Sequence, residues 1–456
     1  MPLRTRSLLR SLHSRTTAIG AAHRGGEPPH HSWRVLRNRN FRLYFCGSVT
    51  SDLGTWLQNT AQVLLAFKLA NSVFDVGLVT CAQFTGPLLL GPSAGVIADR
   101  FGGRRTLLGT QAVGALVAFF MAALVFSHAL NEWLLVTGAL ASGLTFTFAL
   151  PARNVTVQRL VSNEETRAAY VMDAVSYNIG RMLGPVLVVV LLAPNHYGWA
   201  FIANGLSFIV FTTTLLHVRH GKAEPEVRSR VRDGFVIARH ERAILLLLLM
   251  VAAVTVADDP ILVLGPTIAH HLGATPSWAG WFIAALGAGN VLGSVRRTHH
   301  MPTLSLAASA LAALGVCMLL FVATSSIWVS FAAAVGAGVT CLLANSMTRT
   351  LLSQTAGPAR MAPVMAIWAI AWAGSKPLAS LVDGSAAGLI GYRATGILLA
   401  LPVFAPLIYL MIKRYLGRPP SDLERQAPAE VEAGSGIASA PLPRKPAGLD
   451  RHATLQ

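Results

Sequence analysis

Charged residues are scarce in this sequence. Of its 456 residues, 12% are charged and 53% are hydrophobic, and the mean hydropathy is +0.53, whereas soluble domains carry about 25% charged residues. Such a chain cannot shield its apolar surface from water, which excludes a soluble globular protein. The apolar residues fall in blocks of about twenty, the length that crosses a hydrocarbon layer of roughly 30 Å as a helix. The sequence therefore predicts an all-α integral membrane protein.

Cysteines are few, and catalytic motifs are absent. The four cysteines lie one by one inside apolar stretches, which fits small packing residues and excludes a disulfide framework. The sequence has no P-loop, nucleophile elbow or zincin motif, so neither ATP-driven transport nor catalysis has a basis in it. We expect a protein that is not an enzyme and binds no cofactor or metal. Adjacent histidines point in different directions and lack a third ligand, so we interpret two pairs as loop residues: His270, His271, His299 and His300.

Acidic residues are outnumbered, with 20 Asp and Glu against 37 Lys and Arg and a net charge of +17. In a soluble protein this excess would suggest nucleic acid as a partner, but here the basic residues lie between the apolar blocks. Alternate loops are strongly basic, and the loops between them carry only two basic residues, Lys68 and Arg393. The positive-inside rule therefore places both termini in the cytoplasm. We expect a multi-pass protein of the cell (inner) membrane, surrounded by lipid bilayer, with no nucleic acid partner.

The apolar blocks predict twelve transmembrane helices in two six-helix bundles. The longest internal polar segment divides the spans six and six. The predicted organisation is a basic cytoplasmic N-terminal arm (1–41), a first bundle (42–217), a cytoplasmic linker (218–242), a second bundle (243–413) and a disordered cytoplasmic tail (414–456). The twelve spans are expected at 42–68, 73–99, 105–127, 132–152, 168–193, 198–217, 243–265, 277–296, 302–323, 326–349, 362–389 and 392–413.

A segment rich in glycine and arginine lies between the second and third predicted spans. It reads Gly95-Val-Ile-Ala-Asp99-Arg100-Phe-Gly102-Gly-Arg104-Arg105. This segment resembles the cytoplasmic-loop signature of the major facilitator superfamily, and Gln83 with Gly91-Pro92 adds a likeness to the branch that contains the enterobactin exporters. The resemblance implies the two-bundle fold and an acid that helps to latch the bundles in one of two alternating states.

The residues of this segment also have a direct physical interpretation. Gly95 would let two helices approach, Gly102 would permit a tight reversal, and the arginines would hold the loop inside. With the resemblance, Asp99 and Arg100 become gate candidates, and the alternative is a topology anchor with no gating role. The predicted gating loop consists of Gly95, Asp99, Arg100, Gly102, Arg104 and Arg105.

The fifth predicted span carries Gly180-Arg-Met-Leu-Gly184-Pro185, which is similar to the antiporter motif of exporters in this superfamily. Glycines four residues apart make a face on which another helix can pack closely, and Pro185 removes a backbone hydrogen bond where the helix can bend. The glycine pair that usually ends the motif is replaced here by Val188-Val189. An ordinary packing motif is therefore the alternative.

The first predicted span has a polar stripe. Ser48, Asp52, Thr55, Asn59 and Gln62 are spaced so that all five lie on one face of a helix. Asp52 lies about ten residues, roughly 15 Å, from the inner end of the span and so near the midplane. An ionisable group near the midplane of the membrane costs free energy unless it faces a cavity or a partner. We therefore place Asp52, Thr55, Asn59 and Gln62 on a substrate or proton pathway. For Asp52 a buried structural ion pair is the alternative, and the sequence leaves open whether Arg181 is its partner.

Other ionisable residues lie deep in the predicted spans. Asp258 and Asp259 precede Pro260 in the seventh span, and because a helix turns about 100° per residue we expect that they cannot both face one partner. Hydrated acids at a helix break near the outer interface are the alternative. Arg181 shares a face with Asp173. Lys376 is followed at helical spacing by Ser380 and Asp383. The two acids, Asp173 and Asp383, are candidate local partners for the cations on their own spans.

The combined prediction is a monomeric secondary transporter that works by alternating access. We expect proton-coupled export of a small amphipathic or aromatic molecule, such as a drug or a siderophore, with Arg181, Asp258, Asp259 and Lys376 on the pathway. The substrate class comes from the family resemblance alone. The alternatives are an importer or uniporter of the same fold, a membrane scaffold or receptor that does not transport, and an integral membrane enzyme.

Overall fold

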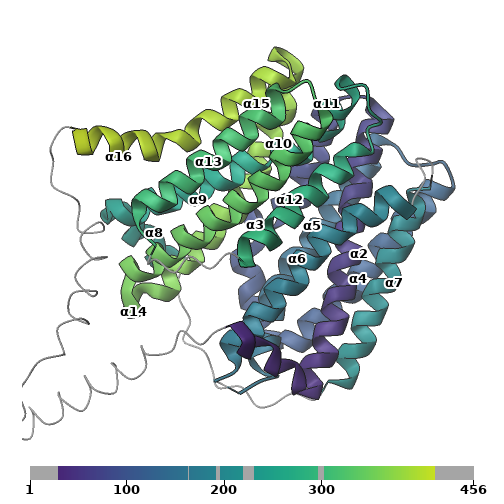
Figure 1. Ribbon diagram of the computed structural model, residues 1–456. Helices are drawn as coiled ribbons and strands as arrows, with labels where there is room; N and C mark the ends of the chain where they lie inside the picture. Colours follow the sequence, from purple (N-terminus) through teal and green to yellow (C-terminus); the bar gives the residue numbers. More distant parts are fainter. Residues whose placement is uncertain (1–28, 163, 192–195, 219–230, 296–301, 416–456) are drawn as a thin grey trace, which may run out of the picture.

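The structure is a computed structural model that describes residues 29–162, 164–191, 196–218, 231–295 and 302–415, in which all regular structure is helical (Figure 1). Most of the predicted arm and tail and part of the linker lie outside these residues. Within the described parts, residues 29–37 of the arm and 231–240 of the linker are helical. The elements are η1 (Pro29–Arg37), α2 (Arg39–Ala70), α3 (Val73–Phe101), α4 (Gly103–Phe126), α5 (Glu132–Gln158), α6 (Thr166–Leu191), α7 (Gly198–His217), α8 (Val231–His240), α9 (Arg242–Asp258), α10 (Pro260–Val263), α11 (Gly265–His271), α12 (Trp278–Val295), α13 (Leu304–Ala323), α14 (Ile327–Ile390), α15 (Tyr392–Ala400), η2 (Leu401–Phe404) and α16 (Ala405–Tyr415).

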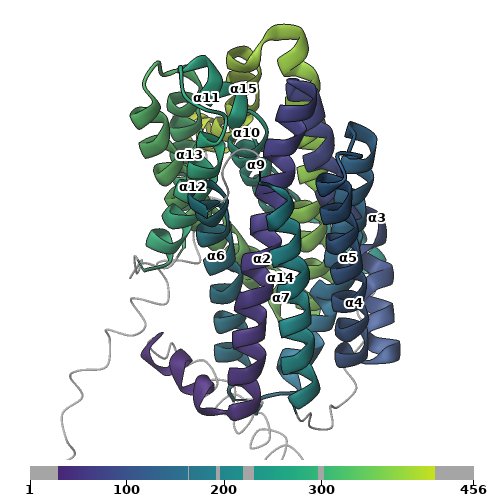
Figure 2. The same ribbon diagram turned by 90° about the vertical axis from the view of Figure 1, so that its right-hand side faces the viewer.

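The long helices form two bundles. In the first, α2 packs on α6 and α7, α4 packs on α5 and α7, and α3 packs on α5. Figure 2 shows α2, α6 and α7 running along the height of the molecule, with η1 at the foot of α2. In the second bundle, α14 packs on α9, α12, α13 and α15.

Ten helical stretches among the described residues are long and apolar enough to cross a membrane. Two of the twelve predicted spans are not among them, α2 and α12, although both are helical. Helix α2 carries the polar stripe, whose side chains lower its mean hydropathy. A helical membrane protein is therefore confirmed, and the number twelve stays a prediction.

The connection between the tenth and eleventh spans is shorter than predicted. Element α14 (327–390) consists of two helices that meet at a kink at Gly357. Its φ of 67° lies in the left-handed region, which glycine adopts without the steric cost that a Cβ would bring. One residue thus redirects the chain where we expected a loop of about a dozen, because the polar residues around it remain helical.

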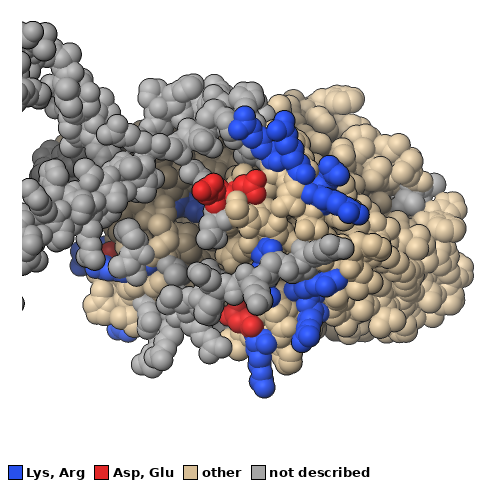
Figure 3. Space-filling model, turned by 90° about the horizontal axis from the view of Figure 1, so that it is seen from below, with Lys and Arg blue, Asp and Glu red and all other residues tan. Residues whose placement is uncertain are grey.

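Exposed arginines gather at one end of the molecule, which Figure 3 shows from below. We call this end the basic end. The other end, where α2 ends and α3 begins, is called the opposite end. A basic end agrees with the pattern from which the positive-inside rule assigned the cytoplasmic side. The exposed arginines at this end are Arg34, Arg37, Arg39, Arg42, Arg100, Arg105, Arg239, Arg242, Arg349 and Arg360.

The main contacts between the two bundles are two helix pairs, α3 with α14 and α6 with α12. Both contacts contain glycines at which a side chain would not fit. A Cβ on Gly77 would lie 2.5 Å from the carbonyl oxygen of Ser380, and a Cβ on Gly287 would lie 2.8 Å from Cα of Met182. These close approaches lie between the opposite end and the middle of the molecule, so the backbones of the two bundles are in direct contact there.

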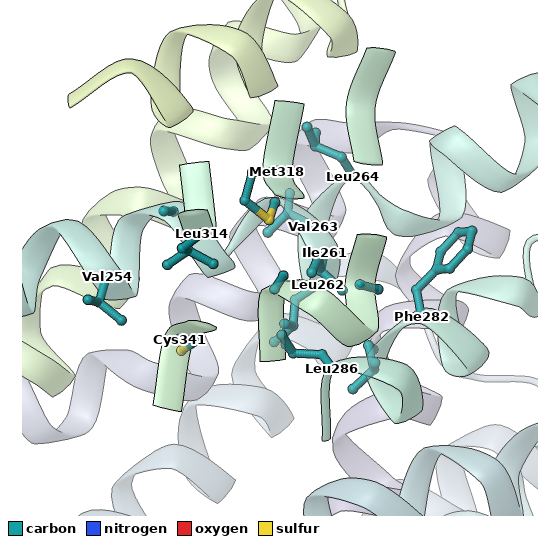
Figure 4. Close-up of a cluster of buried hydrophobic side chains, with 14 of the residues drawn as sticks. Val254, Ile261, Leu262, Val263, Leu264, Phe282, Leu286, Leu314, Met318 and Cys341 are labelled. Atoms are coloured by element: carbon teal, nitrogen blue, oxygen red, sulfur yellow. The ribbon is translucent and has the colours of Figure 1, made fainter. Parts of the chain in front are cut away.

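The chain is irregular where α9 gives way to α10. Proline lacks an N–H and cannot continue the hydrogen-bond pattern of α9, and Pro260 begins α10 directly after Asp259. The apolar residues that follow, including Ile261 and Leu264, lie in a core with Phe282 and Leu286 of α12 (Figure 4). This packing fixes the part of the chain that carries Asp258 and Asp259.

Candidate functional site

Two groups of charged side chains are buried in the molecule. The first, which we call the bundle cluster, consists of Asp52 on α2, Arg153 on α5 and Asp173 on α6. Arg153 donates to Asp52 from both terminal nitrogens, at 2.7 Å to Oδ1 and 3.0 Å to Oδ2, and to Asp173 Oδ1 at 2.9 Å. Since all three helices belong to the first bundle, this cluster closes within one bundle.

Hydroxyl groups complete the bundle cluster. Tyr44 donates to Asp173 Oδ1 at 2.8 Å, and Ser176 donates to Asp52 Oδ2 at 2.5 Å. Ser48 also lies within 3.4 Å of Asp52 Oδ2. Each carboxylate therefore has donors besides the arginine, which offsets the cost of holding two acids near a single cation.

The sequence did not reveal the part that Arg153 plays. We placed it in a basic loop after residue 152, but α5 continues to Gln158 and Arg153 is 7% exposed. The cation facing Asp52 is therefore Arg153 and not Arg181. The available signal was indirect, since a buried carboxylate such as Asp52 needs a partner cation and Arg153 is the first arginine after an apolar span.

The residues of the polar stripe on α2 do not all line the same cavity. Thr55 and Asn59 line a cavity inside the first bundle together with Asp52 and Gln83. Gln62, farther along, accepts a hydrogen bond from Gln83 at 2.8 Å and is fully buried. The cavity has about 60 Å³ available to the centres of water molecules, which suits a few waters and not a drug-sized molecule.

The second group, which we call the interface cluster, joins the two bundles. It consists of Arg181 on α6, Asp258 and Asp259 at the end of α9, and Lys376 and Asp383 on α14. Arg181 donates to Asp258 Oδ2 at 2.9 Å, so a first-bundle cation pairs with a second-bundle acid. Lys376 Nζ lies 3.5 Å from Asp258 Oδ1 and 3.2 Å from Asp259 Oδ1. The contact thus depends on side chains from both bundles.

One expectation about these residues is wrong, and two alternatives that the sequence left open do not hold. Asp258 and Asp259 do share a partner, Lys376, because an ammonium on a flexible stem can lie between two carboxylates that leave the helix in different directions. They are not hydrated acids, since they are 5% and 0% exposed. The acids nearby in sequence are also not the ion-pair partners: Arg181 pairs with Asp258 and not Asp173, and Lys376 pairs with the α9 acids and not Asp383.

Asp383 is the unusual member of the interface cluster. It is 0% exposed, and no hydrogen-bond donor of the described residues reaches either oxygen of its carboxylate. The group that it faces is the carboxylate of Asp259. Asp259 itself accepts a hydrogen bond from Ser380 at 2.6 Å.

The predicted gating loop lies at the basic end. Asp99 and Arg100 are exposed in the last turn of α3, and no ion pair of Asp99 is found among the described residues. Gly102 joins α3 to α4 with a φ of 85°, the tight reversal that we expected. No other helix packs closely against Gly95, since a Cβ at this residue would meet nothing within 4 Å. The close helix approach that we expected there is not found.

The arginines of the loop differ in their contacts. Arg104 donates to the carbonyl oxygens of Leu215 and Leu216 at the end of α7, at 3.0 Å and 2.9 Å. This contact ties the loop to the first bundle. Arg105 borders an apolar groove of about 610 Å³ on α3, α4 and α5, away from both charged clusters.

The glycine motif on α6 lies against α2. A Cβ on Gly180 would lie 2.6 Å from the carbonyl carbon of Asp52, and one on Gly184 would lie 2.7 Å from Cβ of Trp56. Pro185 follows inside the same helix. The two glycines thus set the distance between the helices that carry Asp52 and Arg181.

One of the two histidine pairs lies among the described residues. His270 and His271 end helix α11, so they are not loop residues as we expected, and His299 and His300 lie outside the described residues. In the part of the chain that the structure describes, no group of three or more His, Cys, Asp or Glu is arranged to hold a metal ion.

Residues 30–428 match the protein family described as Transmembrane secretion effector. The chain belongs to this family of major facilitator superfamily transporters. Family membership confirms the resemblance found in the loop and in the glycine motif, and it is compatible with a protein that is not an enzyme.

Relatives of this transporter family share part of the chain. This chain is 25% identical over 273 residues to the uncharacterized MFS-type transporter YfiS of Bacillus subtilis (strain 168). The match covers 57% of this chain and 64% of that protein. The chain is 27% identical over 158 residues to the "Putative multidrug resistance protein MdtD" of Citrobacter koseri, covering 35% of this chain and 32% of that protein. The matches thus span less than two thirds of the length of these relatives.

Solved structures of other transporters share the fold. The nucleoside transporter NupG superposes with a TM-score of 0.66 at 13% identity, over 82% of this chain and 99% of that chain. A POT family transporter in complex with a thioalcohol conjugated peptide superposes with a TM-score of 0.64 at 11% identity, over 84% and 97%. At these identities the likeness shows the two-bundle fold alone.

Proposed function

We propose that this transporter exports a small amphipathic or aromatic molecule, such as a drug or a siderophore, in exchange for protons. It acts as a monomer with twelve spans in the cell (inner) membrane, and the basic end with both termini faces the cytoplasm. The relative named for multidrug resistance supports the substrate class, and the arginines at the basic end support the orientation. Uniport or import by the same fold is the alternative.

The ion pair between Arg181 and Asp258 carries the proposal. It joins the two bundles at 2.9 Å, and its side chains are 13% and 7% exposed. In alternating access the bundles rock against each other about a central site, so contacts between them must form in one state and break in the other. A buried ion pair suits this role, since loss of one charge removes the attraction and leaves the other charge without a partner.

Protons enter this scheme through the acids of the interface cluster. A proton on Asp258 would weaken its pairing with Arg181 and Lys376 and so favour separation of the bundles at the opposite end. Because the described contacts between the bundles lie between the opposite end and the middle, we assign this structure to the state that opens at the basic end. Substrate would enter from the cytoplasm in this state, and its binding would open the opposite end and break the pair. After the substrate leaves, the unpaired Asp258 would take up a proton from outside, which keeps the pair from re-forming until the proton is released to the cytoplasm.

The experiment is efflux of a fluorescent cationic amphiphile from proteoliposomes under an imposed pH gradient. We expect gradient-driven flux in the wild type and a loss of about 5- to 150-fold in Asp258→Asn, the range of typical coupling free energies. Glu132→Gln is the matched control, because Glu132 is an exposed acid in the first turn of α5. Wild-type flux that ignores the gradient would indicate uniport, and equal flux in Asp258→Asn would remove the interface cluster from the mechanism.

A further inference from the structure

The interface cluster holds more acid than base. Its three carboxylates, on Asp258, Asp259 and Asp383, face the two cations Arg181 and Lys376. Asp258 is paired with both cations, and Asp259 is paired with Lys376 and accepts from Ser380. The third acid therefore remains without a cation.

Asp383 forms no ion pair among the described residues, and Lys376 attracts it only without direct contact. It is fully buried in α14, and neither carboxylate oxygen receives a hydrogen bond. An isolated carboxylate in such a place costs several kcal/mol, and here a second carboxylate, that of Asp259, faces it. Two ionised carboxylates repel each other, but a carboxylic acid donates a strong hydrogen bond to a carboxylate.

We propose that Asp259 and Asp383 form a carboxyl pair that holds one proton between them. Water delivers the proton, a single O–H bond forms on one carboxyl oxygen, and the hydrogen bond to the other carboxylate keeps it in place. With this proton the cluster has two negative and two positive charges, so its formal charge is balanced. Asp383 lies two turns before the end of α14 at Ile390, on the side toward the opposite end.

Several other groups act on the pair. Ser380 and Lys376 belong to the same helix as Asp383, and Asp258 lies beside Asp259. Cys81 of α3 interacts electrostatically with Asp259, and Tyr177 of α6 does so with Lys376 and Asp258. Cys341 of α14 interacts electrostatically with Asp258 and with both cations, and Arg181 acts through Asp258 and on Lys376. None of these neighbours supplies a second cation to the pair.

Proton loss from the pair would change how Lys376 is shared. Lys376 now lies between Asp258 at 3.5 Å and Asp259 at 3.2 Å. When the pair loses its proton, the two carboxylates attract the ammonium more strongly, which draws it from Asp258 and leaves Asp258 to Arg181 alone. Proton release would thus strengthen the contact between the bundles and proton uptake would loosen it. This coupling role rests on the proposed function, whereas the shared proton does not.

Infrared spectroscopy of the purified full chain in lipid nanodiscs tests the shared proton. We expect the wild type at neutral pH to show a C=O stretching band of a protonated carboxylic acid that shifts in D2O. The band should be lost in both Asp383→Asn and Asp259→Asn and retained in Glu132→Gln. A band that survives in both Asp variants, or a wild type without one, would overturn the proposal.

A second variant protects the test against misfolding. Ser380→Ala keeps both carboxyl groups and removes the contacts of Ser380 Oγ with Asp259 Oδ2 and with the carbonyl oxygen of Lys376. It should therefore retain the band but change its frequency. An unchanged frequency would contradict the pair even if the Asp variants fail to fold. Gradient-driven flux then separates the two proposals, because a lost band with gradient-independent wild-type flux supports the proton site and rejects proton-coupled export.

Discussion

The two charged clusters differ in what they connect. The bundle cluster joins α2, α5 and α6 of a single bundle, and each of its carboxylates has donors in Arg153 and in hydroxyl groups. The interface cluster joins α6 to α9 and α14 across the two bundles, and its acid Asp383 receives no donor from the described residues. The first cluster is complete within a rigid unit, and the second requires a proton and spans a boundary that transport must open.

This difference shows that a charge near the midplane is not in itself evidence of a transport role. From the sequence, both Asp52 and Asp258 were placed on the substrate or proton pathway, with a helix break at Pro260 as the alternative for Asp258. In the structure, Asp52 is held by an arginine that approaches with two nitrogens, which is the geometry of a fixed structural pair. The partners of a buried acid, and whether they move relative to it, thus decide its role.

The largest expected effect is in the bundle cluster. Arg153→Ala would leave Asp52 and Asp173 buried without a cation, and breaking a buried pair in this way costs about 3–5 kcal/mol. We expect a clear fall in the Tm of the purified protein. Loss of flux should follow from lost folding, so correctly folded protein should be scarce in the membrane.

Asp258→Asn supplies the contrast, measured by the same melting experiment. It removes a charge from a boundary between bundles, so we expect its effect mainly on flux and less on Tm. If Arg153→Ala melted like the wild type while Asp258→Asn unfolded, the assignment of the two clusters would be reversed.

Two glycines sharpen the comparison further. A Cβ would meet backbone at both: at Gly184 it lies 2.9 Å from the nitrogen of Leu57 within the first bundle, and at Gly287 it lies 3.0 Å from the carbonyl oxygen of Arg181 in the other bundle. Overpacking of this kind costs about 1–3 kcal/mol. Gly184→Ala should lower Tm, whereas Gly287→Ala should favour separation of the bundles, by about tenfold for each 1.4 kcal/mol.

Spin-label distances between the exposed residues Leu191 of α6 and Thr275 before α12 would measure that separation. Gly91→Ala is the control, because a Cβ there meets nothing within 4 Å. Equal losses of Tm and unchanged distances in both glycine variants would mean that the α6–α12 contact is as permanent as the α2–α6 contact.

Much of the fold follows from the sequence, because apolar blocks of membrane-spanning length leave little choice except helices. The loop glycine Gly102 and the packing glycines Gly180 and Gly184 were also found by spacing, since their geometry depends on local backbone and on one neighbour. The exceptions are local too. The kink at Gly357 and the continuation of α5 past residue 152 involve polar residues inside helices. The low hydropathy of such residues predicts a loop.

Ion-pair partners could not be predicted in the same way. Arg153 and Asp52 are 101 residues apart, and Arg181 and Asp258 are 77 apart on different bundles. Helical spacing within one span suggests only local partners, and it suggested Asp173 for Arg181 and Asp383 for Lys376. Pairing across helices depends on how the bundles pack, and that information lies in the whole chain and not in any one motif.

The smallest expected effect on stability is at Asp99. It is exposed and forms no ion pair with the described residues, so Asp99→Asn should change the free energy of unfolding by no more than about 0.5 kcal/mol. Arg104→Ala provides the contrast, since it removes two hydrogen bonds to the end of α7 and should lower Tm.

If Asp99 is a gate residue, it forms its ion pair only in the state that closes the basic end. Asp99→Asn should then slow gradient-driven flux while Tm stays unchanged. Flux measured in proteoliposomes at matched protein content decides this. An unchanged rate would make the gate assignment wrong. The interface cluster would then be the only charged contact proposed here that changes between states, and the arginines of the loop would serve to fix its orientation.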